Sequence, residues 1–446
     1  MYLNYLKKLI RFFRDNKIST KTKIEKLIKL PIIFLNYKKN SVVELSQVKT
    51  KTIELIQTPN QAEPNQAEQN SKELIKPLSR NESNKYCVKK IHSKSNVKMS
   101  LPHVEGINSD SIKNIYDINF IPINIYSFMN VYQAEASDII YFPNKNKAFW
   151  NKSFMKFHGI EMHSDSMIDN YCPIKNEISI YKFKAYECLE FENAISLLGV
   201  ASVNVTHFIT EFIPKLMLYI ENLRLTKDYV LLISNDLDSQ QLEMVNHFIK
   251  NFKKISLRKI KSGQYVSCKN LIYCSAVSHL CNNAAYPHLS NIVIPSFTRK
   301  IIRKFYESFE IESKPKRKIY LSRKNRGITN YEEVERFFKN KGYEIIVDSH
   351  LLSLKKKLEI FGNATHIAGP GGSAFTFSYF SKYNCKIILF YNYHRAFDTL
   401  PTQLMSAFPK NKFTYKVVLG LGDSKTDMNC NFYLPLNEIK KLCFDS

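Results

Sequence analysis

The residues best suited to chemistry lie in a short glycine-rich stretch. Gly369, Gly371, Gly372, Ser373 and Ala374 follow a strand-like apolar run and precede a helix-like segment. Small residues at such a turn let a ligand approach the backbone closely, and the amides at a helix start favour an anion, typically a phosphate group. The stretch has neither the G-x-G-x-x-G spacing nor a G-K-[ST] ending, which argues against an ATPase loop. It therefore predicts a phosphate site, with a ligand-free tight turn as the alternative.

An arginine is expected close to this turn. Arg323 ends the strand-like run that begins at Lys318, with Ser322 before it and Arg326 after it. Ligands of open α/β sheets bind at the carboxyl ends of the strands, where Arg323 would lie. Because its guanidinium is a fixed fork suited to a diphosphate, we predict that Arg323 binds one, assisted by Ser322 and Arg326. The alternative is a surface ion pair.

A histidine and a glutamate form a third candidate. His207 and Glu211 are four positions apart, so they share one face of the predicted helix 207–225. A histidine titrates near neutral pH, and a neighbouring carboxylate can tune it, which makes His207 a candidate general base. The alternative is a histidine that caps the helix or is satisfied in the core.

The metal-site candidates are weaker. Asp236 and Asp238 follow the apolar run YVLLIS and match a D-x-D pattern, but the same residues suit an ordinary helix N-cap. His158 and His163 are five positions apart, which is the wrong spacing for a zinc protease. We therefore predict no metal site.

Composition limits the class of protein. The 446 residues are 44% hydrophobic, which argues against a wholly disordered chain, and they include no run of 18 apolar residues that predicts a transmembrane helix. Lys and Arg total 65 against 40 acidic residues, a net charge of +25, so a polyanionic neighbour is expected. The 9 cysteines show no zinc or disulfide spacing, which favours reduced thiols in the cytosol.

The pattern along the chain predicts five segments. Residues 1–39 hold eleven basic and two acidic residues, with apolar residues on one side of a helical wheel. They predict a basic amphipathic helix at an anionic membrane surface, or one packed on the protein. Strand-like and helix-like stretches alternate from residue 110, which predicts an α/β fold. The segments are a basic N-terminal segment (1–56), a flexible polar linker (57–105), an N-terminal α/β domain (106–300), a C-terminal Rossmann-like domain (301–425) and a tail expected to pack back on the N-terminal domain (426–446).

The order of several short motifs resembles glycosyltransferase family 61. The motifs are Ile319–Arg323 (IYLSR), Asn330–Val334 (NYEEV), Gly342–Tyr343, Leu354–Phe361, Gly369–Thr376 (GPGGSAFT) and, upstream, Thr206–Leu216. The resemblance covers roughly residues 200–395. This sequence departs from the family pattern at four positions: Gly371 replaces a histidine, Phe377 an asparagine, Leu389 an acidic residue and Lys215 an arginine.

The resemblance implies a GT-B-like α/β fold of two facing Rossmann-like domains, with the donor held by the C-terminal one. It also implies an inverting, metal-independent hexosyl- or pentosyltransferase (EC 2.4) without a cofactor, using a nucleotide-sugar donor that we expect to be UDP-linked. The acceptor would be a saccharide or lipid-linked saccharide in bacterial capsule or lipopolysaccharide synthesis. Residues 1–39 would hold the enzyme at the inner face of the cytoplasmic membrane. The implied catalytic residues are His207 and Glu211, and the implied donor-binding residues are Ser322, Arg323, Arg326, Gly369, Gly371, Gly372, Ser373 and Ala374.

Two non-catalytic interpretations remain open at this point. The charge of +25 also suits a protein that binds nucleic acid or a membrane surface without catalysis. The sequence has no RRM signature, zinc finger or basic segment interleaved with stacking aromatics, so no nucleic-acid partner is expected. A catalytically inactive scaffold that binds a sugar nucleotide or a membrane is the other alternative.

Overall fold

A computed structural model describes residues 72–93, 95–100, 103–105, 115–150, 168–172, 177–181, 187–278, 294–311, 316–323, 327–381, 385–392, 414–422 and 431–443. Every described residue belongs to one compact unit, residues 71–446. The predicted basic helix within 1–39 lies outside the described residues. No helix of the described part is long and apolar enough to cross a membrane.

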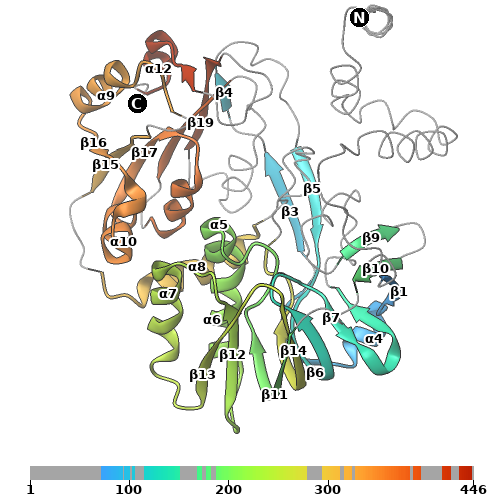
Figure 1. The fold of residues 1–446 in the computed structure, drawn as a ribbon. Helices are drawn as coiled ribbons and strands as arrows, with labels where there is room; N and C mark the ends of the chain where they lie inside the picture. The colour runs from blue at the N-terminus through green and yellow to red at the C-terminus, as the bar shows by residue number, and fades with distance from the viewer. Residues whose placement is uncertain are drawn as a thin grey trace, which may run out of the picture. The chain divides into compact units, whose positions relative to one another are not determined.

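The first sheet has four neighbouring parallel strands in the order β13-β12-β11-β14 (Figure 1). Their bounds are Ile255–Ile260, Tyr229–Ser234, Glu187–Ser196 and Gln264–Cys274. On the other side of β14 the sheet continues through β6 (Ile123–Ala134), β7 (Ile140–Phe142), β8 (Lys147–Phe149), β1 (Lys72–Pro77), β10 (Glu177–Tyr181) and β9 (Ile168–Cys172). The apolar run YVLLIS forms β12, and its last four residues are buried, as expected for a strand covered on both faces.

Helices follow these strands, and the first helical segment contains most of the predicted helix 207–225. A helical segment follows β11 as α5 (Val205–His207), a π-helical turn (Phe208–Phe212) and α6 (Ile213–Asn222). Helix α7 (Ser239–Ile249) follows β12, and α8 (Ser296–Glu307) leads toward the second sheet. Short helices also lie at Arg80–Asn84 (α4) and Pro143–Lys145 (η3).

The second sheet is a doubly wound parallel sheet. Its strands are β15 (Arg317–Leu321), β16 (Glu344–Ile346), β17 (Ala364–Pro370), β18 (Lys386–Asn392) and β19 (Thr414–Gly422). They are parallel in the order β16-β15-β17-β18-β19, so the second strand of the chain lies on one side of the first and the third lies on the other (Figure 1). Strand β20 (Phe432–Tyr433) and β4 (His103–Glu105) both pair with β19.

Helical segments connect these strands in the predicted alternation. They are α9 (Tyr331–Asn340), η9 (Ser349–Leu351), α10 (Leu354–Gly362) and the 3-10 helix η10 (Ser373–Phe380). Gly342 follows α9 with a φ of +77°, the left-handed conformation expected of a glycine after a helix C-terminus. The mixed α/β class is confirmed, and both sheets are compatible with a Rossmann-like fold.

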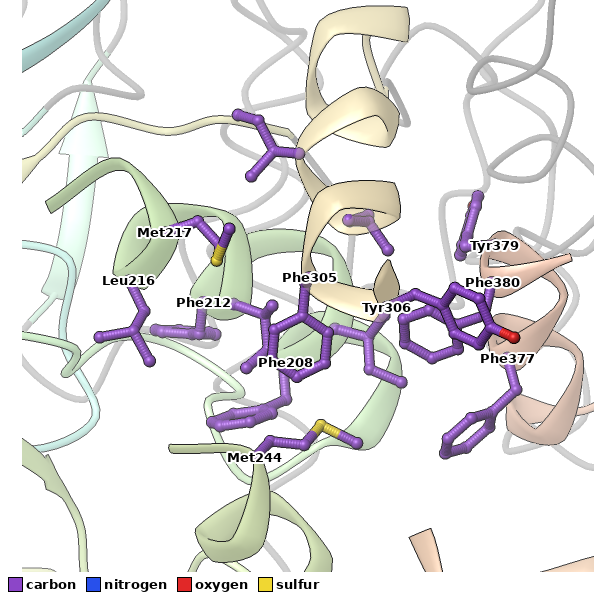
Figure 2. Close-up of a cluster of buried hydrophobic side chains, with 14 of the residues drawn as sticks. Phe208, Phe212, Leu216, Met217, Met244, Phe305, Tyr306, Phe377, Tyr379 and Phe380 are labelled. Carbon is purple, nitrogen blue, oxygen red and sulfur yellow. The ribbon is translucent and has the colours of Figure 1, made fainter. Parts of the chain in front are cut away.

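Aromatic side chains pack the helices of the two sheets against each other. Phe305 and Tyr306 of α8 contact Phe380 of η10, at ring-centroid distances of 6.2 and 5.9 Å, and Phe305 also contacts Phe248 of α7 at 5.0 Å. Figure 2 shows α8 between the helix that carries Phe208 and the helix η10. Burial of each such ring stabilises the fold by about 1.5–3 kcal/mol, so this cluster fixes the position of η10, which begins at the glycine-rich turn.

Part of the predicted linker 57–105 is regular structure. Strand β1 joins β8 to β10, and β2 (Cys87–His92) pairs with β6; β3 (Ser95–Ser100) forms a separate two-stranded sheet with β5 (Ile115–Phe120). Few apolar residues suffice here, because backbone pairing holds the strands and Ile75 and Leu78 are buried. The described residues of 57–105 therefore form strands and a short helix, and the prediction of a flexible linker is wrong for them.

The C-terminal tail also differs from expectation. We expected residues 426–446 to pack back on the N-terminal domain. Among the described residues, Leu434 and Ile439 instead lie buried with Val334 and Phe338 in the core of the second sheet. Helix α12 (Leu436–Cys443) presents its apolar face there because β20, which pairs with β19, places it beside that sheet.

Candidate active site

The glycine-rich turn lies at the point where the strand order of the second sheet reverses. Strands β15 and β17 are adjacent and parallel, with Tyr320 paired to Ala368, so their carboxyl ends meet at one edge. The chain leaves β15 toward β16 on one side and leaves β17 toward β18 on the other. Such a reversal leaves a crevice outside the carboxyl ends of the strands, where ligands of α/β sheets bind.

Arg323 lies against the turn. Its Nη1 donates a hydrogen bond to the carbonyl oxygen of Gly371 at 2.9 Å. Both elements line a cavity of about 350 Å³, here called the turn cavity. Its lining residues are Leu321, Ser322, Arg323, Asp348, Ser349, His350, Pro370, Gly372, Ser373 and Ala374. Arg323 and the residues at the start of η10 thus line one space, an arrangement that suits a diphosphate.

Only some of the other predicted donor-site residues line the turn cavity. Ser322 lines the turn cavity, and its hydroxyl hydrogen-bonds to Glu335 of α9. Gly369 lies within β17 and Gly371 packs against Tyr391, so neither is among the lining residues of the turn cavity. An added Cβ on Gly371 would lie 2.1 Å from Tyr391 Cζ. Arg326 lies outside the described residues.

We did not predict from the sequence that the residues after β16, the third strand that ends at this edge, belong to the site. Asp348, Ser349 and His350 follow β16 and line the turn cavity, and Asp348 has a φ of +48°. The rule that selected Arg323 applies equally here, because these residues follow the strand-like run YEIIV (Tyr343–Val347). The signal was present in the sequence but was not used.

A second cavity adjoins the first. It measures about 290 Å³ and shares Ser349, His350, Ser373 and Ala374 with the turn cavity. The rest of its lining is Val205 of α5, Asp238, Ser239 and Gln240 at the start of α7, Lys357 and Phe361 of α10, and Phe377 of η10. We call it the lysine cavity. Among the described residues that line it, the buried Lys357 is the one lysine or arginine. Residues that follow strands of both sheets therefore line two adjoining cavities.

His207 and Glu211 form a buried pair. His207 Nδ1 lies 2.8 Å from Glu211 Oε1, and the two residues are 6% and 3% exposed. Because a carboxylate accepts, Nδ1 donates and Nε2 is the basic nitrogen of the neutral ring. His207 does not line either cavity, whereas Val205, two residues earlier, lines the lysine cavity. Thr206 Oγ1 lies 2.9 Å from Thr376 Oγ1, which joins the start of α5 to η10.

The two aspartates of the D-x-D pattern, Asp236 and Asp238, make different hydrogen bonds. Asp238 is the N-cap of α7 and accepts a hydrogen bond from the Gln241 amide at 2.8 Å. Asp236 is exposed and bonds to the side chain of Asn235. His158 and His163 lie outside the described residues.

The two glycines of the turn should respond differently to alanine. A Cβ at Gly372 would lie 2.3 Å from Arg323 Nη1, at the far end of a long side chain, so Gly372→Ala should displace the guanidinium and lower kcat/KM about 10–100-fold with little loss of stability. A Cβ at Gly369 would lie 2.5 Å from the Leu321 carbonyl oxygen at a φ of +149°, so Gly369→Ala should lower the free energy of unfolding by about 2 kcal/mol or more.

Steady-state kinetics and denaturant unfolding of both variants check this pair. Full activity in Gly372→Ala would show that the position of Arg323 does not matter. Unchanged stability in Gly369→Ala would show that the strand contact is not as close as the structure has it.

The comparison with known families decides the class of this site. Residues 205–388 match the sequence profile of the family described as Glycosyltransferase 61. This segment is a glycosyltransferase family 61 domain. It begins with the first residue of α5 and ends within β18, so the glycosyltransferase domain includes the His207–Glu211 pair, Arg323 and the glycine-rich turn. A comparison with curated proteins gives no match. The family implies transfer of a sugar from a donor to an acceptor.

Proposed function

We propose that this protein is an inverting glycosyltransferase that uses a nucleotide-sugar donor. The observation that carries the proposal is the hydrogen bond from Arg323 to Gly371, which aims a fixed cation at the turn cavity beside the start of η10. Charge develops on the leaving diphosphate in the transition state, and a preorganised guanidinium and backbone amides stabilise it there. The donor in this proposal is UDP-linked, and the enzyme needs no cofactor.

In the proposed reaction, His207 is the general base and Glu211 holds its ring. Nε2 of His207 takes the proton of the acceptor hydroxyl, and the oxygen attacks the anomeric carbon of the donor sugar. The bond from that carbon to the diphosphate oxygen breaks, and the nucleoside diphosphate leaves toward Arg323. The contact between Thr206 and Thr376 supports this proposal, because it holds the helix start that carries His207 beside the donor-side helix η10.

A nucleotide screen tests the function. Thermal unfolding of the full chain is measured with UDP, GDP, CDP, ADP and TDP and with the corresponding sugar nucleotides. A ligand that binds the native state stabilises it by mass action, and at 100 times its Kd the gain is about 2.7 kcal/mol. We expect one nucleoside diphosphate, UDP, to raise Tm more than the others. Absence of any nucleotide-dependent shift would overturn the proposal.

We also propose transfer without a divalent metal. Arg323 and the amides of the turn supply the positive charge that a metal would otherwise provide at the diphosphate. Addition of EDTA should leave the rate of donor turnover within about twofold of the untreated enzyme. A rate that collapses with EDTA and returns with Mn²⁺ would contradict this mechanism and would direct attention to Asp236 and Asp238.

The proposal extends to the acceptor and to the place of the reaction. The acceptor is a saccharide or lipid-linked saccharide of a bacterial surface polysaccharide. The eleven basic residues of 1–39 support a position at the inner face of the cytoplasmic membrane, where each Lys or Arg near anionic lipid adds about 1 kcal/mol of attraction.

A further inference from the structure

The lysine cavity contains a buried cation that the proposed reaction has not used. Lys357 of α10 is 7% exposed, and its Nζ donates to Gln240 Oε1 at 2.7 Å and to the His350 carbonyl oxygen at 3.4 Å. Its Nζ also lies 5.2 Å from the centre of the Phe377 ring. Among the described residues, no carboxylate lies within ion-pair distance of Lys357. A buried ammonium normally has such a partner, because its desolvation is costly.

An opposing charge lines the same cavity. Asp238, the N-cap of α7, lines it but is not within 4.0 Å of the Lys357 ammonium. Burial lowers the pKa of Lys357, and the charge of Asp238 opposes that shift. An ammonium donates hydrogen bonds and a carboxylate accepts them. A ligand that binds both groups would therefore accept a hydrogen bond from Lys357 and donate one to Asp238.

The remaining walls favour a sugar ring. Phe361 and Phe377 contribute apolar surface, and the cavity shares Ser373 and Ala374, at the start of η10, with the turn cavity. A sugar attached to a diphosphate held at that start extends from the turn cavity into the lysine cavity. Hydroxyl groups satisfy both Lys357 and Asp238, whereas a sugar carboxylate would be repelled by Asp238.

We propose that the lysine cavity binds the transferred sugar as an uncharged hexose whose hydroxyls bridge Lys357 and Asp238. This inference rests on the proposed function, because it takes the diphosphate to lie in the turn cavity. Lys357 and Asp238 are then specificity-determining residues for the donor sugar, and they contribute little to binding of the nucleotide alone.

Calorimetric titration separates the two parts of the donor. The probes are the nucleoside diphosphate that gives the largest Tm shift, its hexose conjugate and its hexuronate conjugate. The variants are Lys357→Met, Asp238→Asn, which keeps an N-cap oxygen, and the double variant. Lys355→Met, an exposed lysine on the same helix, is the matched control. Because Asp238 is exposed, Asp238→Asn keeps the test decisive if Lys357→Met does not fold.

We expect each single variant to weaken binding of the hexose conjugate at least tenfold, while the Kd of the nucleoside diphosphate stays within twofold. The double variant should lose less than the product of the two single losses, because one ligand bridges both residues. Wild-type protein should bind the hexose conjugate more tightly than the hexuronate conjugate. Unchanged hexose binding in the variants, or tighter hexuronate binding in the wild type, would overturn the inference alone. Failure of the wild type to bind any nucleoside diphosphate would instead overturn the proposed function.

Discussion

Replacement of Arg323 by alanine should lower kcat/KM by about 10²–10³-fold and leave the fold intact. The guanidinium donates to the Gly371 carbonyl oxygen and lines the turn cavity, so its removal takes away the fixed charge opposite the leaving diphosphate. The side chain is only half-buried, and the sheet core below it consists of other residues. Donor turnover, the Kd of the nucleoside diphosphate and Tm are measured on the same preparation.

Two further variants serve as controls for Arg323→Ala. Arg323→Lys keeps the charge but loses the planar fork, so it should recover only part of the activity. Arg336→Ala removes an exposed arginine on α9 and should behave as wild type. Kinetics of Arg323→Ala close to those of wild type would remove Arg323 from the site, whatever its contact with the turn.

Replacement of His207 by asparagine should lower kcat by about 10²–10⁴-fold without changing the Kd of the donor. The ring is held by Glu211 at 2.8 Å, which leaves Nε2 to accept the acceptor proton. Glu211→Gln should reduce kcat less, since the amide oxygen can still accept from Nδ1.

Burial of this pair makes a stability control necessary. His207 is 6% exposed, so unfolding of the variants must be compared with that of the wild type at the assay temperature. His247→Asn on α7, outside both cavities, is the matched histidine control. A His207→Asn enzyme that is fully folded and retains its kcat would exclude His207 as the base.

The parts of this site that sequence reasoning found follow from one rule about strand ends. Arg323 and the glycine turn each follow an apolar run, and parallel strands place their carboxyl ends at one edge, so their meeting could be predicted. Lys357 could not be predicted, since its cavity depends on how α10 packs beside α7, a contact between residues more than a hundred positions apart. The polar strands β1 and β2 were missed for a similar reason, because distant strands stabilise them through the backbone.

The close approach of Gly371 to Tyr391 couples the glycine-rich turn to strand β18. Any side chain at 371 would enter the volume of the tyrosine ring, so a histidine there demands a smaller residue at 391. Homologues should therefore exchange these two residues as a pair, and a transplant of either one alone should fail where the joint swap succeeds.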